Sequence, residues 1–216
     1  MMKYVLQTLI CWLLTLVLGI LLGLLANYME EAITAIVTWR SNLLRHYYST
    51  QPGIGFVYYA LFNCALMLLA CIPTLFFAPE AAGSGIPEVK AYLNGVNVKL
   101  FMRMQTLIAK VWGTILAVAS GLAIGPEGPL VHIGATLGSG LTRGPKKIDI
   151  HFMGRTWFSL DIKWDWLSAF HTDADRRDFI SIGAGTGFAA AFGAPVGGVL
   201  FALEVFVFDV KEPLLL

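Results

Sequence analysis

The sequence predicts an all-α, multi-spanning membrane protein with broken and re-entrant helices. Of its 216 residues, 57% are hydrophobic and only 13% are charged, whereas a soluble domain averages roughly 45–50% apolar and about 25% charged residues. The mean hydropathy is +0.71. Such a chain cannot cover its surface in water, so its composition excludes a soluble enzyme and a disordered protein. The 22 glycines and 9 prolines indicate closely packed and interrupted helices.

The charge distribution indicates one membrane domain, residues 1–216, that contains a polar loop. Thirteen of the 29 charged residues lie between Arg143 and Asp178, so residues 143–178 are expected in water. A net charge of +1 leaves no basic surface for nucleic acid. The three cysteines lie in apolar runs without metal-ligand spacing, so no metal site is expected.

Apolar runs predict the membrane segments in order. Residues 4–25 are uncharged and longer than the roughly 7–15 apolar residues of a signal peptide, which favours a retained first span. Residues 54–78 and 105–124 predict the next two spans, the latter carrying Lys110. Residues 130–141 are too short to span. Residues 179–208 predict two helices with a break at Gly193 and Pro195.

The first candidate site is the loop Gly83-Ser84-Gly85-Ile86-Pro87. The two glycines free the backbone, and the proline suits the first turn of a following helix. A helix start presents unpaired N–H groups and the positive end of its dipole, and Ser84 adds a hydroxyl donor. These residues form either a neutral anion site or a plain interhelical turn.

The second candidate site is Gly125-Pro126-Glu127-Gly128-Pro129. Glu127 stands alone in apolar sequence, and an ionisable residue at membrane depth is a functional hypothesis. A carboxylate placed where an anion would sit competes with that anion until it is protonated, which favours a gate. The alternative is a helix cap.

Three other groups leave alternatives open. For Lys110 three alternatives are open: it snorkels to the interface, it pairs with a carboxylate, or it lies near the end of a span. His132 is more typical of a packing residue than of a ligand. An intramembrane protease pair of Ser84 and His132 is disfavoured because the proline after the serine suits a helix start.

Three segments resemble the CLC family of chloride channels and chloride/proton antiporters. They are residues 83–90 (GSGIPEVK), 121–134 (GLAIGPEGPLVHIG) and 189–204 (AAAFGAPVGGVLFALE). The resemblance implies that Ser84, Gly85, Ile86 and Gly128 line an anion site and that Glu127 is the gating glutamate. It also implies a homodimer in a lipid bilayer that transports chloride and needs no cofactor.

Two residues depart from the family pattern. Pro126 stands where the family usually places a lysine or arginine, which removes a positive charge near the pore. Val205 stands where many proton-coupled members have a second acidic residue that relays protons, so the resemblance favours a channel over an antiporter.

The resemblance covers only the first repeat of a transport domain. We expect an integral, multi-pass membrane protein. Because one repeat forms only part of a pore, we expect that it does not conduct chloride as written. A third hypothesis is a non-conducting fragment that pairs with full-length subunits.

Overall fold

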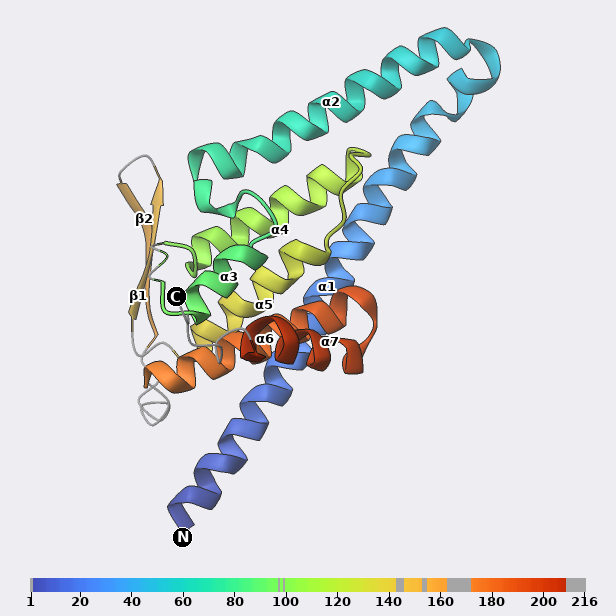
Figure 1. The fold of residues 1–216 in the computed structure, drawn as a ribbon. Helices are drawn as coiled ribbons and strands as arrows, with labels where there is room; N and C mark the ends of the chain where they lie inside the picture. The colour runs from blue at the N-terminus through green and yellow to red at the C-terminus, as the bar shows by residue number, and fades with distance from the viewer. Residues whose placement is uncertain are drawn as a thin grey trace, which may run out of the picture.

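In the computed structural model the chain starts with two long helices that form a hairpin (Figure 1). Helix α1 spans Met2–Thr50 and α2 spans Pro52–Phe76. The structure describes residues 2–96, 98, 100–142, 146–152, 155–162 and 172–208. With 49 residues, α1 is about 74 Å long, more than twice the thickness of a bilayer's apolar core. The sequence predicted the span at 4–25, but the helix continues through the more polar residues that follow.

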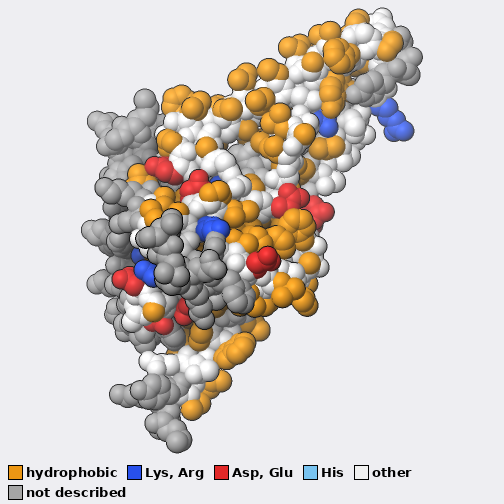
Figure 2. Space-filling model, in the orientation of Figure 1, with side chains coloured by type: hydrophobic (Ala, Val, Ile, Leu, Met, Phe, Trp, Pro, Cys, Tyr) orange, Lys and Arg blue, Asp and Glu red, His pale blue; other side chains and the backbone are white. Residues whose placement is uncertain are grey.

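The exposed surface of the hairpin is apolar. In the described part of the chain, the helices long and apolar enough to cross a membrane are Val5–Arg45 and Pro52–Phe76. Hydrophobic side chains cover the protruding arm of this hairpin (Figure 2), and Phe56 is 70% exposed near the start of α2. A surface of this kind is suited to lipid.

Four further helices form the body against α1 and α2. They are α3 (Ile86–Leu93), α4 (Met104–Ala119), α5 (Glu127–Thr142) and α6 (Asp173–Phe192). One buried cluster joins α1 to α4 and α5 through Leu18, Leu22, Val111 and Ile133. Helix α4 corresponds to the third span, which was predicted at 105–124. It ends at Ala119 and is shorter than predicted.

Glycines bring α5 and α6 into backbone contact. A Cβ on Gly134 would run into the carbonyl oxygen of Gly183, and a Cβ on Gly183 would run into that of Gly134. Gly138 faces the carbonyl of Phe179 in the same way, and Gly187 faces that of Leu130. Only glycine permits this approach, which is the small-residue packing expected of membrane helices.

The predicted break in the last apolar run is confirmed. Helix α6 ends at Gly193, whose φ of 60° is left-handed, and α7 (Pro195–Ala202) starts with a proline in its first turn. The π-helical segment η3 (Leu203–Phe208) follows α7, and the 3₁₀ turn η1 (Pro79–Ala81) precedes α3. The turn at Gly193 and these two segments of non-α geometry agree with the interrupted helices that the sequence predicted.

The polar loop carries one element that the sequence analysis did not predict. Strands β1 (Lys146–Phe152) and β2 (Arg155–Ile162) pair as an antiparallel hairpin beside the helical body (Figure 1). Alternation of Ile148, Ile150 and Phe152 with polar residues was the available signal. The helical architecture expected for the membrane part holds, and the hairpin is an addition to it. Residues 143–145, 153–154 and 163–171 of the predicted loop lie outside the described residues.

Candidate functional site

The loop before α3 has the backbone expected of an interrupted helix start. Gly83 and Gly85 have φ angles of 75° and 87°, a region that L-residues rarely adopt. Gly85 is the N-cap of α3, and Pro87 lies in its first turn. Ile86 packs against the core cluster through its side chain, so the start of α3 is held in place.

Ser84 lies at the exposed surface of this loop. Its hydroxyl oxygen accepts a hydrogen bond from the backbone N–H of Ile86 at 3.4 Å. Since the oxygen is the acceptor in this contact, the O–H proton of Ser84 remains a donor for a ligand. The first predicted site therefore has the hydroxyl donor and helix start that an anion requires.

The second predicted loop meets the first at Gly128. A Cβ placed on Gly128 would lie 2.7 Å from the Cβ of Ser84 and 3.4 Å from its Cα. Gly128 is in the first turn of α5, and the N–H of Leu130 donates to the carbonyl of Pro126 at 2.9 Å. The starts of α3 and α5 thus come together at two residues that are far apart in sequence.

Glu127 is the first residue of α5, and its side chain turns back over the preceding loop. A Cβ on Gly125 would collide with the Glu127 carboxylate. The side chain of Glu127 is half-buried, as are Pro126 and Pro129. Glycine at 125 therefore provides the space that the carboxylate occupies.

A buried pair of polar side chains, Lys110 and His132, packs against the loop that precedes α3. The ammonium of Lys110 donates to Nδ1 of His132 at 2.7 Å, because an ammonium has only donors. His132 Nε2 then carries the proton and donates to the carbonyl of Phe101 at 3.1 Å. The rings of His132 and Phe101 stack with their centroids 3.8 Å apart.

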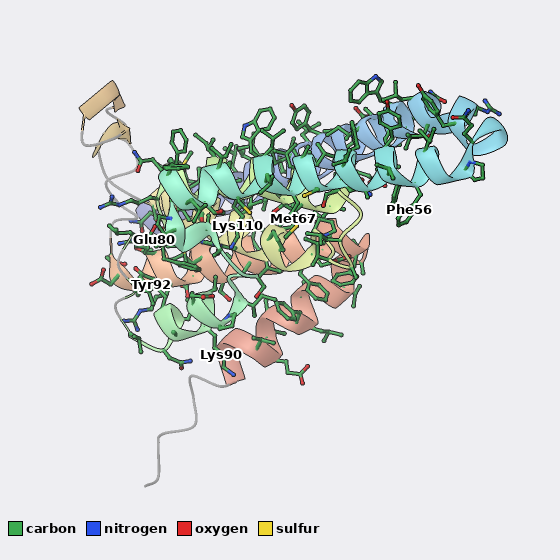
Figure 3. The ribbon with its side chains drawn as sticks, turned by 90° about the horizontal axis from the view of Figure 1, so that it is seen from above. Phe56, Met67, Glu80, Lys90, Tyr92 and Lys110 are labelled. Atoms are coloured by element: carbon green, nitrogen blue, oxygen red, sulfur yellow. The ribbon has the colours of Figure 1, made fainter. Side chains whose placement is uncertain are left out.

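The His132 ring touches the first loop directly. A Cβ on Gly85 would lie 2.6 Å from the Cβ of His132 and 2.6 Å from two atoms of its ring, Cγ and Nδ1. Lys110 is 3% exposed and lies among the packed helices, away from the end of α2 that carries Phe56 (Figure 3). Sequence analysis allowed a carboxylate as the partner of Lys110, whereas the structure pairs it with a histidine. His132 is a satisfied packing residue, as the sequence favoured.

The third predicted break contacts its own helices. The Cβ position of Gly198 faces Gly185 and Ala189 of α6, and that of Gly197 faces Ala194. Gly193 and Pro195 therefore form the turn between α6 and α7. Val205, which occupies the proposed relay position, is partly buried against the core cluster that includes Val89 and Phe101.

Comparison with known proteins gives the family. The model of the voltage-gated chloride channel family matches residues 65–215. Chloride channel protein CLC-d of Arabidopsis thaliana is 42% identical over 193 residues, covering 89% of this chain and 23% of that protein. The human H(+)/Cl(-) exchange transporter 7 is 36% identical over 200 residues, covering 89% of this chain and 23% of that protein.

Solved structures agree with this result. A eukaryotic CLC transporter superposes with a TM-score of 0.77 at 28% identity, covering 96% of this chain and 35% of that one. A slow cyanobacterial Cl-/H+ antiporter gives 0.72 at 26% identity, covering 93% and 41%. The chain spans about a quarter of the length of the curated relatives it matches, CLC-d among them at 23%. The chain belongs to the voltage-gated chloride channel family, a family of membrane transport proteins.

Proposed function

We propose that this chain forms the chloride-binding and gating part of a chloride channel. Ser84 donates its hydroxyl to the anion, and the N–H groups at the starts of α3 and α5 add donors and positive helix ends. The observation that carries the proposal is the contact between Ser84 and Gly128, which brings both helix starts to one place. The proposed functional unit is a homodimer in a lipid bilayer, without a cofactor.

The gate in this proposal is Glu127. Its carboxylate lies over Gly125 at the start of α5, where it competes with an anion for the same donors. Protonation removes the negative charge and releases the site, so chloride entry rises as the pH falls. The absence of a basic side chain at Pro126 weakens attraction of anions toward this entrance.

A chloride/proton exchanger is the second candidate. Relatives named as H(+)/Cl(-) exchange transporters are 36–38% identical to this chain, which favours it. Val205 favours the channel, because an apolar side chain packed against Val89 and its neighbours cannot carry a proton.

Chloride binding tests the site without requiring transport. Chloride titrated into the purified chain in detergent, against gluconate as the control anion, is expected to release heat for a saturable site. Ser84→Ala should weaken that binding by about tenfold, the effect of one hydrogen bond to an anion. Glu127→Gln should strengthen binding at neutral pH and remove its pH dependence. Equal titrations for wild type and both variants would overturn the site.

Flux then separates the functions. Liposomes containing the purified chain are loaded with chloride, an ionophore releases the voltage, and chloride efflux and external pH are recorded together. Efflux without a pH change supports the channel, and coupled proton movement supports the exchanger. Chloride binding without efflux supports a non-conducting fragment, which should then co-purify with a full-length subunit.

A further inference from the structure

Arg40 joins three helices at one point. It lies on α1, and its Nη1 donates to Oδ1 of Asn63 on α2 at 2.7 Å and to the carbonyl oxygen of Ala119 at 2.9 Å. Ala119 is the last residue of α4. The guanidinium is partly buried at these contacts, where a charge needs hydrogen-bond partners, and both of the acceptors are neutral.

The charge of Arg40 suits the end of α4. The last carbonyls of a helix lack intrahelical partners and carry its partial negative charge, so a cation is favourable there. The guanidinium also lies 5.1 Å from the ring centroid of Tyr59 on α2, within the range of a cation–π interaction. Arg40 therefore links the end of α4, through the Ala119 carbonyl, to α2, through Asn63 and Tyr59.

The chain that leaves α4 packs on the same residues. Gly121 turns with a φ of 80°, and a Cβ on it would lie 3.5 Å from the Tyr59 hydroxyl and 3.8 Å from Nη1 of Arg40. Figure 1 shows this turn between α1 and α2. The first residues after α4 are thus attached to the α1–α2 hairpin.

The next residues carry Glu127 away from that attachment. Leu122 and Ile124 are 39% and 51% exposed, and the N–H of Ile124 donates within the segment to Leu122 at 2.8 Å. Residues 120–126, called the gate segment here, are thus held at Ala119 and Gly121 upstream and by the contact of Gly128 with Ser84 downstream. Where the upstream end is held affects where the Glu127 carboxylate lies.

We infer that Arg40 is a positioning residue for the gate, which fixes the gate segment to α1 and α2 and so sets how firmly the Glu127 carboxylate occupies the anion site. This inference rests on the gate proposed for Glu127. It gives the α1–α2 hairpin a route to influence anion entry through the end of α4.

Hydrogen exchange of the purified full chain tests the attachment. Arg40→Met should accelerate exchange of the hydrogen-bonded amides of Ser120 and Gly121 by about tenfold, because the charge-assisted hydrogen bond that holds the neighbouring carbonyl of Ala119 is lost. Amides of α5 and α6 around Gly134 and Gly183 should keep their wild-type rates. Arg45→Met is the matched control, since Arg45 lies on the same helix and is exposed. Arg40→Lys keeps a charged donor and should restore slow exchange at least in part.

Chloride binding tests the link to the gate. In Arg40→Met the carboxylate is held less firmly, so chloride binding should persist to higher pH than in wild type. That difference should vanish when Glu127→Gln is added. Unchanged exchange of the Ser120 and Gly121 amides, equal acceleration along the whole chain, or a pH shift that survives Glu127→Gln would each overturn the inference. If the segment loosens while Glu127→Gln leaves chloride binding unchanged, the gate is wrong and the attachment alone stands.

Discussion

Gly128 lies so close to Ser84 that a Cβ added to it would be 2.7 Å from the serine Cβ. The two residues belong to different loops, and their contact brings the start of α5 against the start of α3. An anion held by Ser84 therefore also lies near the first turn of α5, where N–H groups lack intrahelical partners.

Gly128→Ala tests this contact. The Cβ of Ser84 is fixed to its backbone, so the added methyl group must displace the whole residue. Chloride affinity is expected to fall by about tenfold or more, as for the loss of one hydrogen bond. Titration of chloride into the variant measures this. Gly140→Ala is the control, since nothing lies within 4 Å of a Cβ there, and wild-type affinity in Gly128→Ala would contradict the contact.

Gly85→Ala and Gly83→Ala separate backbone strain from collision. Both glycines have positive φ angles, of 87° and 75°, but only Gly85 faces the His132 ring. Alanine in the left-handed region costs about 1–2 kcal/mol, so Gly83→Ala should lower the free energy of unfolding by about that amount. Gly85→Ala should cost clearly more. Denaturation in detergent compares them, and equal losses would argue against the packing of Gly85 on His132.

Gly134→Ala tests the contact between α5 and α6. The methyl group has no space beside the carbonyl of Gly183, so the helices must separate, and overpacking of this kind costs about 1–3 kcal/mol or more. Thermal unfolding in detergent should show a lower midpoint. Gly140→Ala, on the open side of α5, should instead raise the midpoint, since alanine favours a helix by about 1 kcal/mol over glycine.

His132→Leu and His132→Gln test the support beneath the site. Leucine leaves the buried ammonium of Lys110 without its acceptor, and an unsatisfied buried charge costs more than the about 1–3 kcal/mol of a neutral buried group. Glutamine can accept from Lys110 and donate to Phe101 as the histidine does. We expect near-normal stability for His132→Gln and a large loss for His132→Leu in chemical denaturation. Equal stability of the two variants would show that the hydrogen bonds of His132 do not matter.

Pro126→Lys tests the effect of the missing charge. A lysine beside Glu127 should strengthen chloride binding at neutral pH by electrostatic attraction, and the gain should shrink in high concentrations of a non-binding salt. Pro126→Ala controls for loss of the proline ring, because the carbonyl that accepts from Leu130 is kept. A gain that is the same at low and high salt would argue against an electrostatic cause.

Local features of the site could be predicted from sequence, whereas its long-range contacts could not. Gly83, Gly85 and Pro87 mark a helix start through backbone conformations that depend only on near neighbours. The same holds for the break at Gly193. The contact of Ser84 with Gly128 depends on how α3 and α5 pack, and no local pattern encodes that.

Isolated polar residues in apolar sequence indicate buried polar partners, but the sequence analysis did not pair them. Lys110 and His132 each lie in apolar sequence, and each needed a buried partner. Pairing the two would have predicted their 2.7 Å contact. Asn63 offered the same signal, since it lies in the apolar helix α2. The first span was predicted at residues 4–25 because the uncharged run ends there, whereas α1 continues to Thr50.

The glycine contact between α5 and α6 makes this part of the gene unusually sensitive to missense change. Every amino-acid replacement of a glycine adds at least one carbon atom, and at Gly134, Gly138, Gly183 and Gly187 that atom would meet backbone of the facing helix. A shift of a neighbouring side chain cannot relieve a collision with backbone. We therefore expect harmful variants in a population to gather at these codons, while the codons of Gly19 and Gly140, where a Cβ meets nothing within 4 Å, tolerate alanine.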